Sequence, residues 1–195
     1  MQWLTTSLVL ERLRDDEAGT WALFVHRFRQ PVVMFARDLG LPLDEAEDAA
    51  QETLKEFVTA YRQGKYDRNR GRLRSWLFGI AHRVVLNRRR LLARDRKRQP
   101  AGQRTAFWDA LPAEELAYKS WDEHWQRAVF TQCMQQVQTE LDPKTVRAFE
   151  LFAMNGRPAS DVAADLGMSR NAVFLAKHRV LKRIRQLRDQ IDDVQ

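Results

Sequence analysis

The chain has 195 residues, of which 44% are hydrophobic and 30% are charged, with only 8 glycines and 6 prolines. This composition favours helices joined by short connections, in one ordinary domain or two small ones. The net charge of +7 favours a polyanionic partner. The single cysteine, Cys133, excludes an internal disulfide, and the four histidines lack metal-binding spacing. Because no apolar run resembles a signal peptide or a membrane span, we expect a cytoplasmic protein without membrane insertion, cofactor or metal.

Apolar residues at helical spacing predict four helices in a first block, beginning near residues 7, 18, 44 and 72. Pro31 should kink or break the second helix, and Gly40-Leu41-Pro42 should end it. Residues 63–71 have turn chemistry and should form a loop before the fourth helix. The first block is therefore expected to be a compact helical domain.

A charged and then mixed segment without a sustained period follows this block. We predict a first helical domain at residues 1–95, a linker at 96–120 that can hold a short helical piece, and a second helical domain at 121–195. Helices in the second domain are expected at about 122–140, 143–154, 159–166 and 170–190. The predicted fold class is all-α, with two small helical domains joined by a flexible linker.

The most specific pattern lies between Ala159 and Lys182. Ser160 can cap a short helix, Gly167 can supply a left-handed turn, and Ser169 can cap the next helix. A short helix, a glycine turn and a capped helix are typical of a DNA-binding helix-turn-helix. The alternative is a helical hairpin whose basic back is merely solvated. We favour DNA, and the candidate contacts are Ser169, Arg170, Asn171, Ala172, Phe174, Lys177, His178 and Arg179.

A second basic region surrounds the start of the fourth helix. Arginine recurs at every second position from Arg68 to Arg74, further arginines follow Arg83, and Tyr66 and Trp76 lie among them. Basic side chains with aromatic rings suit single-stranded DNA, whose unpaired bases can stack on the rings. The alternative for Trp76 is a core residue, because its helix neighbours are apolar.

The third helix begins with the opposite charge. Acidic side chains in a first turn are favoured by the helix dipole, which is the purely structural alternative. Asp44, Asp48 and Glu52, however, lie one turn apart on one face, where like charges repel one another. A basic protein that keeps such a stripe is expected to use it on a protein partner.

Together these residues resemble the sigma-70 family, specifically its small extracytoplasmic-function (ECF) group, which has only regions two and four. The segments that carry the resemblance are Glu45 to Glu52, Arg74 to Ala81 with Asn87-Arg88-Arg89, and Leu141-Asp142-Pro143 with the helix-turn-helix. The resemblance implies a factor that binds core RNA polymerase and directs promoter recognition, DNA melting and transcription initiation.

The resemblance also implies roles for residues. The helix that docks on the clamp helices of the largest polymerase subunit would use Asp44, Glu47, Asp48, Gln51 and Glu52. The segment that reads and melts the −10 element would use Lys65, Tyr66, Arg68, Asn69, Arg70, Arg72, Arg74, Trp76, Arg83, Asn87 and Arg88. The helix-turn-helix would bind the −35 element and the flap of the other large subunit. Phe174 and Ala176 depart from the family pattern, because basic residues usually stand there.

The implied mechanism is binding and not catalysis, and such a factor is normally held by an anti-sigma protein. One rival is a free-standing helix-turn-helix regulator with a helical sensor domain, which would bind duplex DNA alone. Another is a metal-dependent nuclease that uses Asp44, Glu47 and Asp48, although these acids open a helix and have no supporting histidine or lysine.

Overall fold

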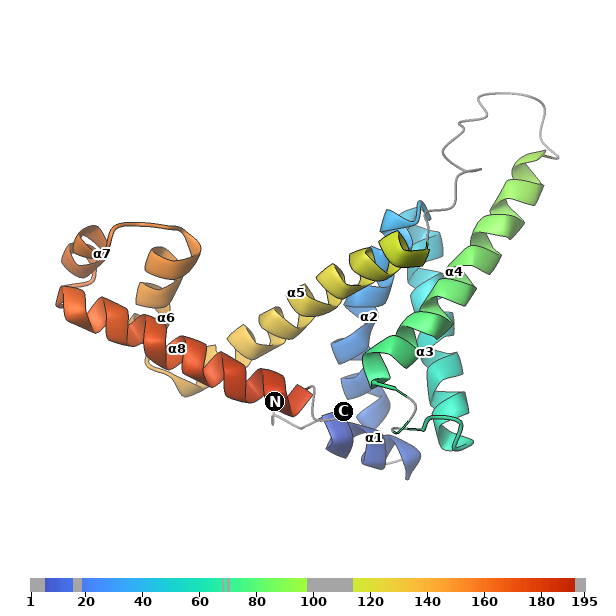
Figure 1. Ribbon diagram of the computed structural model, residues 1–195, viewed down its shortest axis with the longest axis horizontal. Helices are drawn as coiled ribbons and strands as arrows, with labels where there is room; N and C mark the ends of the chain where they lie inside the picture. The colour runs from blue at the N-terminus through green and yellow to red at the C-terminus, as the bar shows by residue number, and fades with distance from the viewer. Residues whose placement is uncertain (1–5, 16–18, 68, 70, 98–113, 192–195) are drawn as a thin grey trace. The chain divides into compact units, whose positions relative to one another are not determined.

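The computed structural model describes residues 6–15, 19–67, 69, 71–97 and 114–191 (Figure 1). These residues form helices and no strand, which confirms the all-α prediction. The chain divides into two compact units that meet between Ala128 and Val129. We call residues 6–128 the N-terminal unit and residues 129–191 the C-terminal unit. Among the described residues, no helix is both long enough and apolar enough to cross a membrane.

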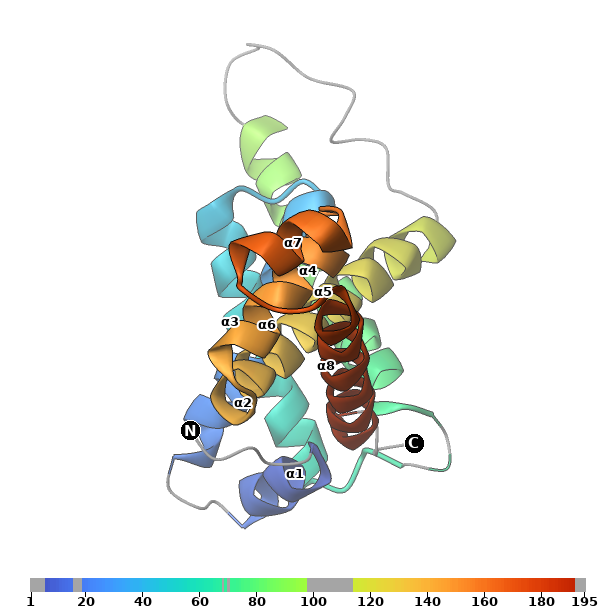
Figure 2. The same ribbon diagram turned by 90° about the vertical axis from the view of Figure 1, so that its left-hand side faces the viewer.

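The N-terminal unit is built from four helices and the first half of a fifth. They are α1 (Thr6–Arg14), α2 (Thr20–Asp38), α3 (Leu43–Arg62), α4 (Leu73–Lys97) and α5 (Glu114–Glu140). Helix α3 packs against both α2 and α4, and the three lie side by side in Figures 1 and 2. The face of α3 that was expected to be apolar is buried along its whole length, at Ala46, Ala50, Leu54, Phe57 and Tyr61.

Helix α2 continues through Pro31 without the break that was considered for this position. Proline removes one backbone hydrogen bond, but Phe28 and Val32 on either side are fully buried, as is the Pro31 ring. Packing therefore holds the helix together across a residue that disfavours it. The helix ends where predicted, because Gly40 adopts a positive φ of 89° and lets the Leu41 N–H reach the Ala36 carbonyl.

Aromatic side chains form the centre of the N-terminal unit. The Phe57 ring of α3 lies 5.0 Å from the Phe24 ring of α2 and 4.8 Å from the Trp76 ring of α4. The Tyr66 ring, in the loop before α4, stacks on Trp76 at 5.0 Å. The described residues of 63–71 form no α-helix, as predicted, and this stack attaches their loop to the core.

The first half of α5 belongs to the same core. Trp121 is fully buried and its ring meets Phe35 of α2 edge-on at 5.6 Å, while Trp125 stacks on Phe28 at 5.4 Å. Polar contacts support this packing, because the Ser120 hydroxyl and His124 Nε2 both lie 2.7 Å from Asp38 Oδ2. Burial raises the pKa of Asp38, but the bonds from His124 and Ser120 outweigh it and leave the pKa below its usual value.

The boundaries of the first unit differ from those predicted, which ended the linker at residue 120 and began the second domain at residue 121. Residues 114–120 are helical, and residues 121–128 pack within the N-terminal unit. Helix α4 also extends to Lys97 at the other end of the linker. The physical reason is the burial of two tryptophans, which extends the helix toward the N-terminus. Residues 98–113 lie outside the described residues.

The C-terminal unit contains the second half of α5, α6 (Pro143–Phe149), the π-helical turn η3 (Glu150–Met154), α7 (Ala159–Asp165) and α8 (Arg170–Ile191). Figure 2 shows α7 beside α8, and the two meet across a small core. The core consists of Ala148, Leu151, Ala159, Val162, Ala163, Val173 and Ala176.

The turn of the predicted helix-turn-helix has the expected geometry. Gly167 has a φ of 56°, and the Ser169 hydroxyl accepts the Ala172 N–H at 3.1 Å, so that it caps α8. The predicted cap at Ser160 is wrong, because Pro158 occupies the cap position of α7 and the Ser160 hydroxyl donates to Asp161. Proline with its fixed φ can begin a helix without a side-chain cap.

The burial of Trp121 yields a stability prediction. Changing Trp121 to Ala should lower the free energy of unfolding by about 3–5 kcal/mol, because it leaves a large cavity between α2, α4 and α5. Urea unfolding followed by circular dichroism measures this loss. The control is Leu116→Ala in the same helix, which should change stability little because Leu116 is 61% exposed. Equal stability of the Trp121 variant and the wild type would contradict the packing described for α5.

Candidate functional site

An arginine of α4 joins three acidic residues of α3. Arg88 lies 2.8 Å from Glu45, 3.4 Å from Asp48 and 3.1 Å from Glu52, counted between guanidinium nitrogens and carboxylate oxygens. Partial burial lowers the pKa of Arg88. The bonds to Glu45 and Glu52 together have the larger effect and leave the pKa above its usual value. We call Glu45, Asp48 and Glu52 the acidic stripe. Arg88 offsets the repulsion between Asp48 and Glu52 that the sequence spacing implied, and its third partner is Glu45 and not Asp44.

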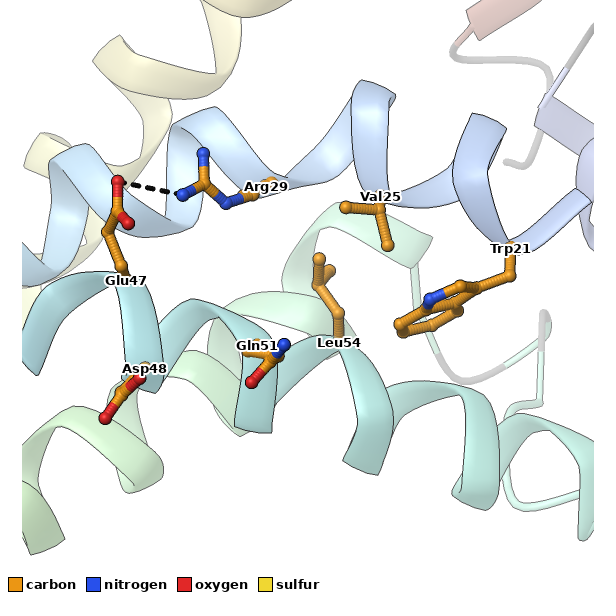
Figure 3. A pocket seen from close by; sticks show the side chains of 7 residues that line it. All are labelled: Trp21, Val25, Arg29, Glu47, Asp48, Gln51 and Leu54. Carbon is orange, nitrogen blue, oxygen red and sulfur yellow. Dashed lines mark ion pairs between the residues drawn. The ribbon is translucent and has the colours of Figure 1, made fainter. Parts of the chain in front are cut away.

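Beside the stripe lies an open pocket of about 200 Å³ between α2 and α3 (Figure 3). Trp21, Val25 and Leu54 line its apolar end. The polar end contains Glu47, whose carboxylate pairs with Arg29 at 2.8 Å, together with Asp48 and Gln51. The pocket therefore offers a partner an apolar surface next to carboxylates and an amide.

The residues of the predicted core-docking set lie together on this part of α3. Asp44, Glu47, Asp48, Gln51 and Glu52 are all exposed. The sequence did not point to the contribution of α2, which supplies Trp21, Val25 and Arg29. Trp21 is 39% exposed although it is a large apolar residue of a helix with a buried apolar face.

The loop before α4 holds part of the predicted −10 set. The Tyr66 hydroxyl donates to the Gly71 carbonyl at 3.3 Å, and the Asn69 N–H bonds to the Asp67 carboxylate at 2.9 Å. Lys65 and Arg72 are exposed, whereas Arg68 and Arg70 lie outside the described residues. Trp76 is half-buried, so it is both a core contact of Phe57 and an accessible ring.

Three arginines of the predicted −10 set are paired with acids in this structure. Arg74 lies 2.6 Å from Asp122 of α5, and Arg83 forms an ion pair with Glu56 of α3. Arg88 is held by the acidic stripe and is only 24% exposed. Arg74 and Arg88 thus connect helices, whereas Arg83 remains largely exposed at 57% despite its pair.

A stripe of exposed polar side chains follows α4 beyond the loop. Arg83, Asn87, Arg90 and Arg94 are exposed and recur at intervals of three or four residues, so they share one helix face with Trp76. Asn87 accepts a bond from Arg90 at 3.5 Å. This face can contact successive phosphates while the Tyr66–Trp76 stack offers a ring surface. Arg90 and Arg94 extend the predicted set.

The first three turns of α8 present most of the predicted −35 set. Arg170, Asn171, Phe174, Lys177, His178 and Arg179 are exposed, and Ala172 is half-buried. Ser169 contributes the cap described above. Lys177 Nζ lies 5.5 Å from the centre of the Phe152 ring, a cation–π contact within the C-terminal unit.

A bidentate salt bridge connects the middle of α8 to α5. Arg183 bonds both carboxylate oxygens of Glu140, at 2.5 and 2.9 Å. The Arg183 guanidinium lowers the pKa of Glu140 below its usual value, and burial opposes this shift. The bridge joins the end of α5 to the middle of α8.

Among the described residues, no group of three histidine, cysteine or carboxylate side chains could hold a metal ion. Of the α3 carboxylates, Glu45, Asp48 and Glu52 pair with Arg88, and Glu47 pairs with Arg29. The arrangement is suited to binding: an acidic and apolar pocket for a protein, and basic helix faces for nucleic acid.

Comparison with known proteins finds a family match within the N-terminal unit. Residues 24–95 match the model of Sigma-70 region 2, and the match contains α3, the loop and most of α2 and α4. No curated protein matches the chain. One solved structure that it resembles is that of CnrH in complex with the cytosolic domain of CnrY, at 18% identity and a TM-score of 0.37, over 93% of this chain and 96% of that chain.

Residues 24–95 therefore match sigma-70 region 2, in agreement with the predicted resemblance to the sigma-70 family.

The position of Arg88 yields a prediction. Changing Arg88 to Gln should lower the free energy of unfolding by up to about 1 kcal/mol, since it leaves three carboxylates without their shared cation. The loss should shrink as salt is added, because salt screens carboxylate repulsion. Thermal unfolding at low and high salt measures it. Arg90→Gln is the control with the same charge change on an exposed site, and equal losses in the two variants would contradict the role given to Arg88.

Proposed function

We propose that the chain is an ECF-type sigma factor that binds core RNA polymerase and directs promoter recognition, DNA melting and transcription initiation. The observation that carries the proposal is the combination on one chain of a region 2 domain with an α2–α3 pocket, a basic aromatic helix and a helix-turn-helix. Each of these features suits one of the contacts that a promoter-bound polymerase requires.

The core polymerase is proposed to dock on the pocket and the acidic stripe, through the clamp helices of its largest subunit. Asp44, Glu47, Asp48, Gln51 and Glu52 are the proposed contacts, and Trp21 adds an apolar anchor. Aromatic anchors in partly formed pockets commonly carry a large share of binding energy at protein interfaces. The exposed carboxylates would fix the orientation of the partner more than its affinity.

The −10 element is proposed to bind along the loop and α4. Unpaired bases would stack at Tyr66 and Trp76, and the phosphates would meet Arg72, Arg83 and the stripe that continues to Arg94. Lys65, Asn69 and Asn87 would add polar contacts. Arg74 and Arg88 are proposed to position α4 through their ion pairs and not to contact DNA in this conformation.

The −35 element is proposed to bind as duplex DNA at the start of α8, which would lie in the major groove. The flap of the other large polymerase subunit is proposed to bind the C-terminal unit. An anti-sigma protein is a further proposed partner. Strand opening would be driven by binding energy, because the bases captured by the N-terminal unit are available only when the duplex opens.

Core binding can be tested with a paired charge reversal. Asp48→Arg combined with Glu52→Arg should reduce retention by immobilised core RNA polymerase at least tenfold, since it replaces attraction by repulsion at the docking surface. The readout is the amount of chain recovered at several chain concentrations. Glu114→Arg combined with Glu115→Arg is the matched control, with the same charge change at exposed sites in the first turn of α5.

Circular dichroism must show that both double variants are folded. Retention of the Asp48/Glu52 variant at the wild-type level would contradict the proposed docking surface. Failure of the wild type itself to bind the core would contradict the proposed function as a whole.

A further inference from the structure

Two large apolar side chains are exposed on α8, the helix proposed above to bind duplex DNA. Phe174 is 48% exposed and Leu175 is 46% exposed. The buried face of the same turns is formed by Val173, Ala176 and Val180. At 3.6 residues per turn, Phe174 and Leu175 lie on either side of the direction opposite to that face. They therefore flank the exposed side of the helix, on either side of the line of Asn171, His178 and Lys182.

The Phe174 ring is held in place by the core beneath it. It meets the Phe152 ring edge-on, at 5.3 Å between centres and 89° between planes. Phe152 is half-buried against the core of the C-terminal unit, and Lys177 lies over its ring. Phe174 is therefore supported by Phe152 on its inner side and remains 48% exposed on its outer side.

The surroundings of this apolar pair are basic. From Arg170 to Arg188, α8 contains no acidic residue, and Asn171, His178 and Lys182 are exposed beside the pair. The partner that fits this surface is thus a polyanion that carries an apolar group where it contacts Phe174 and Leu175. In the major groove of duplex DNA, the apolar group at the base edges is the thymine methyl.

We propose that Phe174 and Leu175 read thymine methyl groups in the major groove and so help determine which upstream promoter sequence this chain selects. The inference rests on the proposed function, because it assigns a base preference to the same DNA-binding helix. Asn171 and Arg179 would supply the polar contacts around the methyl groups. The proposal also gives a reason for the aromatic residue at position 174. A basic residue there would strengthen binding to every DNA sequence equally.

The test uses core RNA polymerase loaded with the full chain. Duplexes that bind are first selected from a library randomised in the upstream element, and each thymine there is then replaced in turn by deoxyuridine. Deoxyuridine pairs like thymine and lacks only the methyl group. At one or two positions the replacement should weaken binding about fourfold, the effect of burying one methyl group. At the same positions, Phe174→Ala or Leu175→Ala should weaken binding to the thymine duplex and remove its advantage over deoxyuridine.

Leu116→Ala, which removes an exposed leucine from α5, should keep the full discrimination. The inference is overturned if no deoxyuridine changes affinity, or if both α8 variants still discriminate between the two bases. It is also overturned if these variants bind DNA normally and lose a protein partner instead. If the loaded polymerase selects no upstream element at all, the proposed function fails, which is a different result.

Discussion

The packing of aromatic rings in the N-terminal unit is the constraint on which the rest of that unit depends. Phe57 lies at its centre, with Phe24 of α2 on one side and Trp76 of α4 on the other. Trp76 holds Tyr66, and thereby the loop proposed to capture bases, while Trp121 attaches α5 to α2. Because rings at about 5 Å interlock with little freedom, the surfaces of the unit are fixed relative to one another. A site that captures bases gains from this rigidity, since less ordering is needed when they bind.

Acidic and basic side chains gather on different surfaces of the chain. Acidic residues gather on α3, basic residues on α4 and α8, and the contact between α3 and α4 is where the signs meet. Arg88 is shared among Glu45, Asp48 and Glu52, which lets an acidic stripe persist beside a basic helix. The exposed carboxylates that remain can attract a protein, and the exposed arginines of α4 can attract phosphates. The chain thereby offers surfaces of opposite charge to the two kinds of partner proposed for it.

Local sequence patterns predicted the helices, the loop at 63–71 and the turn at Gly167, because these depend on spacing and on single-residue conformations. The capping role of Ser160 was predicted wrongly because two residues compete for that end of α7, and Pro158 occupies it. The entry of α5 into the first core was missed, although Ala117, Trp121 and Trp125 recur every four residues and are all buried. The pairing of Arg88 with α3 could not be predicted from spacing, since the partners are up to 43 residues apart. The pocket depends in the same way on the side-by-side packing of α2 and α3.

The central claim is that the chain gives core RNA polymerase its promoter selectivity. The most direct measurement is transcription in vitro from fragmented genomic DNA of the source organism, by core polymerase with and without the chain, with the 5′ ends of the transcripts sequenced. The account predicts discrete start sites that appear only with the chain and share sequence elements near −10 and −35. It is contradicted if the chain adds no start sites while it alone shifts duplex DNA, which would indicate a free-standing helix-turn-helix regulator.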